Sequence, residues 1–287
     1  MKTQYGYTLD LDFFNESSPE RDYFLGLWWA DGCLQGNCVQ LSTNRKDKSH
    51  LRHTVRHFST HPVYDYAYES TVYWRVSCVE LADKIRGLGG TERKSRNVTW
   101  PDWLNYRDAS HFVRGVFDGD GFALISEGCL VIGFSSGSKA FVDELQACVN
   151  QIPDVRSRLE HRLPTSAEIR GKQANFSDSY QLRLSGSSAE KLGRWMYRGA
   201  GELALERKQL IFQERERRKT ETVAKKEAHK QEREKLAIRV NALRKEGVLC
   251  QDIAVLLNDD GVVNSRGGDW SAPWTAASVS QLSTRGW

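Results

Sequence analysis

One pattern of apolar and small residues occurs twice along the chain. Residues 23–32 (YFLGLWWADG) and 112–121 (FVRGVFDGDG) each contain a glycine, a small residue four positions later, and a final Asp-Gly among bulky apolar residues. In a helix, the glycine and the small residue share one face. Two such faces can approach until their backbones nearly touch. We therefore predict two closely crossing helices, each ended at its Asp-Gly by a glycine in the left-handed C-cap conformation.

A similar succession of strand and helix patterns follows each of these segments. Alternation of polar and apolar residues indicates strands, and wider apolar spacing indicates helices. In the first half the predicted elements are a hairpin over 33–43, a helix over 46–58, a hairpin over 64–77 and a helix over 80–88. In the second half they are a hairpin over 122–135, a helix over 139–151, strands over 155–163 and 179–185, and a helix over 188–197. Residues 164–178 are predicted to form a long loop.

The composition changes after these two repeats. Between residues 213 and 235, nine Lys/Arg and six Asp/Glu accompany only three apolar residues, so no stripe exists to bury. This segment is expected to be a solvated helix or a disordered linker. We predict an α+β fold of two pseudo-symmetric αββαββα repeats plus a small helical domain. The predicted divisions are an N-terminal segment, two repeats, a charged linker and a C-terminal domain, at 1–19, 20–108, 109–212, 213–236 and 237–287.

Composition limits the class of protein. Mean hydropathy is −0.58 and no apolar run approaches the roughly 20 residues of a membrane span. The first residues lack the apolar core of a signal peptide. The six cysteines form no CxxC pair, and several lie in segments predicted as strand or helix, as buried free thiols do. This favours a reducing compartment and a cytoplasmic protein. A net charge of +4 does not by itself demonstrate nucleic-acid binding.

The repeated segments resemble the LAGLIDADG motifs of homing endonucleases, in the form with both motifs on one chain. The resemblance covers residues 20–212, because each motif heads the same order of helices and hairpins. It implies two sheets whose exposed faces form a saddle on double-stranded DNA, with strands in the major groove. It also implies a monomer that binds a long target site, cuts both strands across the minor groove and leaves 3′ overhangs.

The two Asp-Gly ends carry the candidate chemistry. Crossing the helices brings Asp31 and Asp120 together, and two acids that repel one another favour a divalent cation between them. Such ions assist phosphodiester hydrolysis by generating hydroxide and neutralising the leaving group. The resemblance implies Mg²⁺, for which Mn²⁺ or Ca²⁺ is expected to substitute in binding. The candidate metal site consists of the two acids and their neighbours: Ala30, Asp31, Gly32, Gly119, Asp120 and Gly121.

The resemblance also implies a lysine near each scissile phosphate, after the last helix of each repeat. Lys94 and Lys208 occupy these places and are expected to polarise the attacking water or stabilise the transition-state charge. Ser42 and Ser135 lie in similar positions on the second strand of each half, where family members order solvent. Asp118, two residues before Asp120, points to another helix face and is expected to pack or cap a helix rather than to catalyse.

Base contacts are expected from polar side chains that alternate along the strands, since Arg and Gln match guanine and adenine edges. Ordinary solvated strand residues are the alternative interpretation of each. The candidates in the strands are Gln35, Gln40, Arg75, Arg156, Arg158 and Arg183. The predicted long loop adds Arg170 and Lys172.

The C-terminal piece resembles the helix-turn-helix region of large serine recombinases. It contains Ile-Ala-x-Leu-Leu-Asn at 253–258, a Gly-Gly-x-Trp loop at 267–270, and Trp-Thr-x-x-Ser-Val at 274–279 opening the last helix. Such helices read the major groove from their N-terminal residues, so the candidates are Thr275, Ser278, Ser280 and Gln281. A small helical protein-binding domain is the alternative.

Two other interpretations compete with the nuclease, and one further group of residues could bind a metal. An intron maturase would bind RNA as a splicing cofactor, and a transcriptional regulator would bind DNA, both on the same fold without cleavage. Retention of both acids and both lysines favours the nuclease. Histidines at 50, 53, 57 and 61 lie on one helix face, where pairs four apart can bind zinc. A surface helix near DNA is the simpler interpretation, because the sequence supplies no further ligand beside them.

Overall fold

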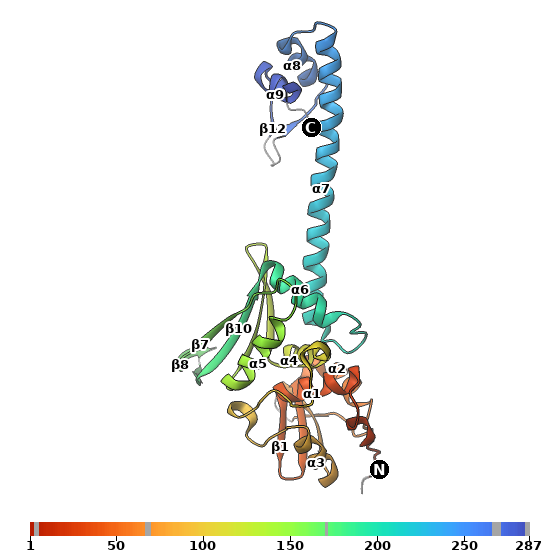
Figure 1. Ribbon diagram of the computed structural model, residues 1–287, viewed down its shortest axis with the longest axis vertical. Coiled ribbons are helices and arrows are strands. Elements are labelled where there is room, and N and C mark those ends of the chain that lie inside the picture. The colour runs from red at the N-terminus through yellow and green to blue at the C-terminus, as the bar shows by residue number, and fades with distance from the viewer. Residues whose placement is uncertain (3–5, 67–69, 170–171, 266–270, 285–287) are drawn as a thin grey trace. The chain divides into compact units, whose positions relative to one another are not determined.

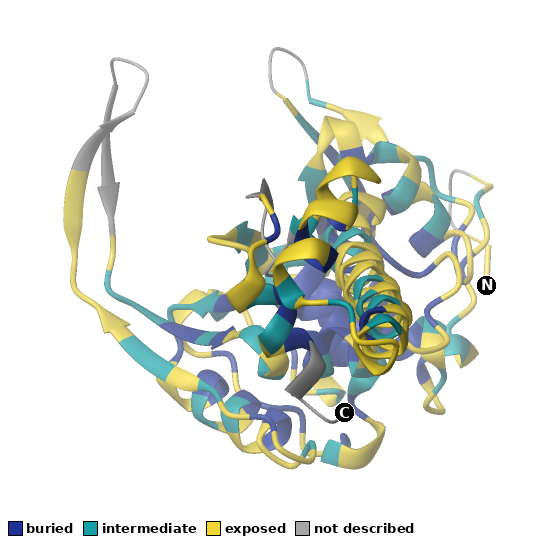
Figure 2. Cartoon of the chain, turned by 90° about the horizontal axis from the view of Figure 1, so that it is seen from above, coloured by how far each residue is buried: buried dark blue, intermediate teal, exposed yellow. Residues whose placement is uncertain are grey.

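The computed structural model describes residues 1–2, 6–66, 70–169, 172–265 and 271–284. Contacts divide the chain into two compact units, Met1–Arg215 and Glu216–Trp287. The division falls inside the charged segment that the sequence predicted as a helix or a linker. That segment is helical and belongs to α7 (Glu206–Lys245), in which most residues between 213 and 235 are exposed (Figure 2).

The first unit contains the same arrangement twice (Figure 1). The first half consists of η1 (Asp12–Phe14), α1 (Pro19–Asp31), β1 (Gly32–Gln35), β2 (Cys38–Asn44), η2 (Arg45–Asp47), α2 (Lys48–Val55), β3 (Tyr64–Asp65), β4 (Thr71–Ser77) and α3 (Val79–Gly87). The turns η3 (Lys94–Arg96) and η4 (Tyr106–Asp108) connect it to the second half. The second half consists of α4 (Ser110–Asp120), β5 (Gly121–Ser126), β6 (Cys129–Ser136), α5 (Lys139–Val149), β7 (Arg158–Arg162), β10 (Ser179–Ser185) and α6 (Gly186–Tyr197).

Both four-stranded sheets are antiparallel and share one topology. Their strand orders are β1-β2-β4-β3 and β5-β6-β10-β7. Alternate residues of the central strands are buried against the helices, including Val39 and Leu41 of β2 and Trp74 of β4. The opposite face carries the polar positions. The predicted α+β class with two repeats is confirmed.

The two motif helices cross with backbone contact. A Cβ added at Gly26 of α1 would lie 2.0 Å from the carbonyl oxygen of Phe112 in α4. One added at Gly115 of α4 would lie 2.3 Å from the carbonyl oxygen of Tyr23. No side chain fits at either position, so glycine there is a requirement of the crossing. The predicted close approach is confirmed.

The predicted left-handed caps at the helix ends are wrong. Gly32 (φ −78°, ψ 161°) and Gly121 (φ −85°, ψ 162°) are both extended. The chain passes directly from each helix into a strand, so it never turns back on itself. Glycine is still needed, because a Cβ would lie 2.4 Å from the ring of Trp28 or of Phe117. The constraint is space beside an aromatic ring rather than a positive φ.

The predicted long loop over 164–178 is also wrong, because it contains β8 (Thr165–Ile169) and β9 (Lys172–Phe176). The pairing of β8 with β9 continues the register in which β7 pairs with β10. Arg162 pairs with Ser179 at the end of the first ladder, and Thr165 pairs with Phe176 at the start of the second. The segment therefore extends the hairpin of the second sheet. The prediction rested on the length of the segment between two predicted strands, and length alone does not reveal this pairing.

The second unit has a small core of its own. After α7 come α8 (Cys250–Asp259), β11 (Asn264–Ser265), β12 (Ser271–Ala272) and α9 (Ala276–Thr284). The first residues of the predicted C-terminal domain, 237–245, form the end of α7 rather than a separate element. The buried hydrophobic residues of this core are Ala237, Val240, Ile253, Ala254, Leu257, Trp274, Val279 and Leu282. Among the described residues, no helix combines the length and the apolar character that crossing a membrane requires.

Candidate active site

The structure brings the two predicted acids together. Asp31 is the last residue of α1, and Asp120 is the last residue of α4. A Cβ added at Gly119 would lie 2.3 Å from the Cβ of Ala30 and 3.2 Å from Oδ2 of Asp31. The carboxylate of Asp31 therefore lies against the residue that precedes Asp120. Small residues at 30 and 119 make this approach possible.

The carboxylates repel one another. Loss of hydration, followed by the charge of Asp120, raises the pKa of Asp31 to about 6. Loss of hydration also raises the pKa of Asp120. Nearby ammonium groups oppose both shifts, with Lys94 acting more strongly than Lys208 on each acid. Both side chains still reach solvent. Neither accepts a hydrogen bond or forms an ion pair within the described parts of the chain.

This donor set fits a hydrated divalent cation. Two carboxylates supply hard oxygen ligands, and Mg²⁺ characteristically binds one or two carboxylates while retaining waters and substrate phosphates. Among the described residues, no group of three or more His, Cys, Asp or Glu side chains is placed to hold a metal ion together. The neighbouring predicted ligands fit less well. The carbonyls of Ala30, Gly119 and Gly121 already accept hydrogen bonds from lysine ammonium groups, and a metal there would place two cations on one oxygen.

Lys94 and Lys208 both reach the ends of the motif helices, but their surroundings differ. Nζ of Lys94, in η3, donates to the carbonyl oxygens of Trp29 (2.7 Å) and Ala30. Nζ of Lys208 donates to four carbonyl oxygens around the end of α4: Phe117 (2.6 Å), Asp118 (2.8 Å), Gly119 (3.3 Å) and Gly121 (2.6 Å). Lys208 is buried, and burial lowers its pKa to about 8.

Asp118 is a packing residue, as predicted. Its carboxylate is buried and accepts hydrogen bonds from the hydroxyls of Tyr23 (2.8 Å) and Tyr197 (3.0 Å) and from the backbone N–H of Leu205 (2.8 Å). These contacts join α1, α6 and the start of α7 to α4. The buried Asp118 thus anchors the end of α4, which carries Asp120, to the elements around it.

Sequence reasoning missed the buried Arg114. Its guanidinium donates to the carbonyl oxygens of Leu203 (2.6 Å) and Met196 (2.6 Å) and lies 5.1 Å from the ring centroid of Tyr23. An arginine within an apolar helix pattern, four residues before Asp118, was the available signal. Its two carbonyl partners are more than 80 residues away along the chain, so the pattern could not identify them.

The sheet faces opposite the helices carry two similar hydrogen-bonded chains, in the second of which Gln181 is buried. In the first sheet, Arg75 Nε donates to Gln40 Oε1 (2.7 Å), and Gln40 Nε2 donates to Ser42 Oγ (2.7 Å). In the second, Arg162 donates to Gln181 Oε1 (2.5 Å), and Gln181 Nε2 donates to Ser135 Oγ (3.0 Å). Arg162 and Gln181 were not predicted.

The strand register places both serines beside the acids. Gly32 pairs with Leu41, and Gly121 pairs with Phe134. Ser42 and Ser135 are the next residues along β2 and β6, on the side of each ladder from which Asp31 and Asp120 lead into Gly32 and Gly121, although neither acid is itself paired. The predicted solvent-ordering positions are therefore at the strand ends nearest the carboxylates.

The remaining sheet residues predicted to contact DNA lie in different surroundings. Gln35 is exposed beside the buried Leu34, and Arg158 and Arg183 share the polar face with Glu160, at 3.5 and 3.9 Å from its carboxylate. Arg156 is exposed but precedes β7 rather than lying in it. Arg170 lies outside the described residues. Only the backbone of Lys172, in β9, is described.

Two of the residues predicted to contact DNA bases from the last helix form hydrogen bonds with each other. The backbone N–H of Thr275 donates to Ser278 Oγ (2.9 Å), and the N–H of Ser278 donates to Thr275 Oγ1 (3.2 Å). This reciprocal cap begins α9 and commits both side chains to a structural role. Ser280 is half-buried, whereas Gln281 is exposed.

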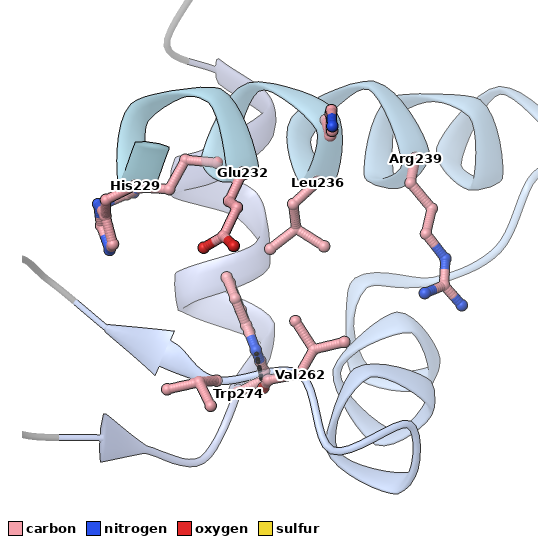
Figure 3. Close-up of a pocket in the computed structure, with 9 residues that line it drawn as sticks. His229, Glu232, Leu236, Arg239, Val262 and Trp274 are labelled. Atoms are coloured by element: carbon pink, nitrogen blue, oxygen red, sulfur yellow. Dashed lines mark hydrogen bonds between the residues drawn. The ribbon is translucent and has the colours of Figure 1, made fainter. Parts of the chain in front are cut away.

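A separate pocket of about 440 Å³ lies within the second unit (Figure 3). Leu236 of α7 faces Trp274 and Val262 across it, with His229, Glu232 and Arg239 around them. Trp274 Nε1 donates to the carbonyl oxygen of Val262 at 2.9 Å.

The histidines of the first unit serve different partners. His50 Nε2 lies 2.6 Å from the hydroxyl of Tyr23, and His53 Nδ1 lies 3.2 Å from the carboxylate of Glu202. The rings of His53 and His57 are 5.3 Å apart. The candidate zinc set is thus divided between a buried network and an exposed ion pair.

No protein-family model and no curated protein sequence matches the chain. Among solved structures, it is similar to mesophilic variants of the homing endonuclease I-DmoI (TM-score 0.43, 16% identity, covering 62% of this chain and 95% of that one). It is also similar to the LAGLIDADG meganuclease I-AabMI bound to uncleaved DNA (TM-score 0.43, 11% identity, 72% and 93% covered). A third similar structure is full-length DUF199/WhiA from Thermatoga maritima (TM-score 0.41, 12% identity, 94% and 92% covered).

Proposed function

We propose that this protein is a monomeric, site-specific endonuclease that hydrolyses both strands of duplex DNA with a divalent metal ion. One observation carries the proposal: two unpaired carboxylates, Asp31 and Asp120, meet at the ends of two crossing helices. They repel one another, and a hard cation would remove that repulsion. The pseudo-symmetry of the two halves supports one half-site for each strand.

The chain's own residues divide the work. Asp31 and Asp120 would hold Mg²⁺, which when bound neutralises charge on the phosphate and the leaving oxygen. Ser42 and Ser135, each one residue beyond the position paired with Gly32 or Gly121, would hold solvent near the scissile bonds. The polar sheet faces would position the duplex, with the Arg–Gln–Ser chains pre-ordering donors for base edges and phosphates.

The alternatives are a maturase that binds RNA and a regulator that binds DNA without cutting it. The acids argue against both. Partial loss of hydration and the charge of Asp120 raise the pKa of Asp31 to about 6 although its side chain is exposed, so the ionised form of Asp31 modestly destabilises the metal-free fold. A protein that only binds nucleic acid would gain stability by replacing it with asparagine.

The test begins with target selection. A plasmid library with randomised inserts is incubated with the protein and Mg²⁺, and linearised plasmids are captured and sequenced. The selected duplex is then used with Asp31→Asn, Asp120→Asn and the exposed control Asp83→Asn. We expect the first two to lose double-strand cleavage while keeping their affinity for DNA in Ca²⁺, and the control to behave like the parent.

Undiminished double-strand cleavage by Asp120→Asn would refute the assignment. Specific DNA binding by the parent with no cleavage in Mg²⁺ or Mn²⁺ would instead identify a regulator. Enhancement of intron splicing that survives both substitutions would identify a maturase.

We further propose that the second unit adds DNA contacts. Its support is the sequence pattern around α8 and α9 and the exposed Gln281 on α9. Truncation after Arg215 is expected to weaken affinity without removing the chemistry.

A further inference from the structure

We propose that the two lysines at corresponding positions have different functions. Lys94 has an N–H group available for a scissile phosphate, whereas Lys208 is a structural clamp, by which we mean that its ammonium group holds the carbonyl oxygens at the end of α4. The clamp depends only on the hydrogen bonds of the fold. The phosphate contact rests on the proposed nuclease function.

The donors of Lys208 are fully used. A lysine ammonium has three N–H groups, and that of Lys208 faces four carbonyl oxygens at 2.6–3.3 Å. The residue is 4% exposed. These carbonyls include ones left without partners where α4 ends, and a cation there also complements the helix dipole. A phosphate could gain Lys208 only if the helix end lost these bonds.

Two more contacts hold Lys208 in this position. The backbone N–H of Leu205 donates to Asp118 at 2.8 Å, and Arg207 Nη2 lies 3.1 Å from Asp47 Oδ2. Asp47 comes from the other half of the unit and is buried. The start of α7 is therefore tied on both sides of Lys208, which restricts any swing toward a ligand.

Lys94 has a different environment. Its ammonium donates to two carbonyl oxygens, those of Trp29 and Ala30, and no further acceptor for its third N–H occurs among the described residues. The residue is half-exposed. It follows Arg93, which has a positive φ of 54°, in a short connector whose nearby side-chain tie is Glu92, which accepts a hydrogen bond from the backbone N–H of Gly36 at 3.0 Å. Lys94 can add a phosphate oxygen without giving up an existing bond.

The consequence is two unequal half-sites. A positioned cation stabilises charge that develops on the phosphoryl oxygens, and removing one such donor typically slows catalysis by about 10²–10³-fold. The strand served by Lys94 should therefore be cut first, and a nicked duplex should accumulate before the second cut.

The clamp is tested without DNA or metal. The full chain is melted as the parent, Lys208→Met, Lys94→Met and the exposed control Lys139→Met. We expect Lys208→Met to lower the Tm of the first unit by on the order of 5–10 °C. Lys94→Met should lower it less, because two rather than four carbonyl oxygens lose a donor, and Lys139→Met should stay within about 2 °C of the parent. Lys208→Arg, which keeps donors, should recover part of the loss and remains measurable if the methionine variant does not fold. A Tm for Lys208→Met equal to the parent's overturns the clamp.

The phosphate role is tested on the selected duplex, labelled separately on each strand. The parent should cut one strand at least about ten-fold faster, and Lys94→Met should slow that strand by about 10²-fold or more. Lys208→Arg, assayed well below its Tm, should keep the parental strand ratio. Equal cutting of both strands, with each lysine variant slowing a different strand, overturns the division of roles. Absence of cutting by the parent would count against the nuclease proposal, while the melting result would still decide the clamp.

Discussion

The crossing of α1 and α4 gives the sharpest test of the fold, through the substitution Gly26→Ala. The added Cβ would lie 2.0 Å from the carbonyl oxygen of Phe112, 2.8 Å from its carbonyl carbon and 3.0 Å from its Cα. Carbon atoms in contact normally lie about 3.5–4.0 Å apart. All three neighbours are backbone atoms and cannot rotate away, so the helices must separate by more than about 1 Å.

Two opposing effects set the magnitude. Overpacking a tight core costs about 1–3 kcal/mol, and sometimes more. A gap of about 1 Å also forfeits up to half of the dispersion energy of the separated contacts. Replacing helical glycine by alanine, in contrast, stabilises by about 1 kcal/mol. We place Gly26→Ala at the upper end of the overpacking range, so its net effect is a loss of about 2 kcal/mol or more.

A matched control is present in the same unit. Gly87 ends α3, and a Cβ added there would meet no atom within 4 Å. Gly87→Ala is expected to be neutral or to stabilise by up to about 1 kcal/mol. The difference between the two variants therefore isolates the clash from helix propensity.

The assay is calorimetric unfolding of the metal-free full chain. For a unit of this size, 1 kcal/mol corresponds to about 2–4 °C, so Gly26→Ala should lower the Tm of the first unit by about 4–8 °C or more. Cleavage should fall as well, since separating the helices also separates Asp31 from Asp120. If Gly26→Ala has the same Tm as Gly87→Ala and the parent, the two backbones are not in contact. Asp31 and Asp120 are then not held close enough to share a cation.

Four further outcomes are expected. Asp31→Asn should stabilise the metal-free protein above pH 6: the folded pKa is about 6 against an ordinary 3.8, so the acid's contribution to stability falls as pH rises between these values. Since the carboxylate reaches solvent, the gain at pH 7.5 should be about 1 kcal/mol at most, and equal melting of variant and parent at pH 7.5 would contradict it. Tyr23→Phe should cost about 2 kcal/mol by removing a donor from the buried Asp118, and Tyr197→Phe somewhat less because its hydrogen bond is longer and less buried; denaturant titration checks both. Affinity for DNA should fall steeply with salt through phosphate contacts, measured by fluorescence anisotropy in Ca²⁺. A protein of residues 1–215 should bind the selected duplex more weakly yet still nick it at saturation, and loss of nicking there would contradict the division of labour.

The sequence by itself determined the plan of the first unit. Glycine and small residues four apart, repeated at 26/30 and 115/119, are a local pattern that requires a close helix crossing. Alternation along the strands is equally local, and it correctly placed Gln40 and Arg75 on the polar face. The two acids followed from the same pattern, because each is the last residue of a helix whose end the motif defines.

The tertiary structure decided what depends on residues far apart in the chain. The four acceptors of Lys208 lie 87–91 positions before it, so its clamp is invisible in any local window. Residues 164–178 were predicted to be a loop, but β8 and β9 pair within them. At Gly32, glycine is required by the lack of space beside Trp28 and not by the left-handed turn that was predicted. Local spacing fixes which face a residue occupies, but only packing fixes which atoms meet there.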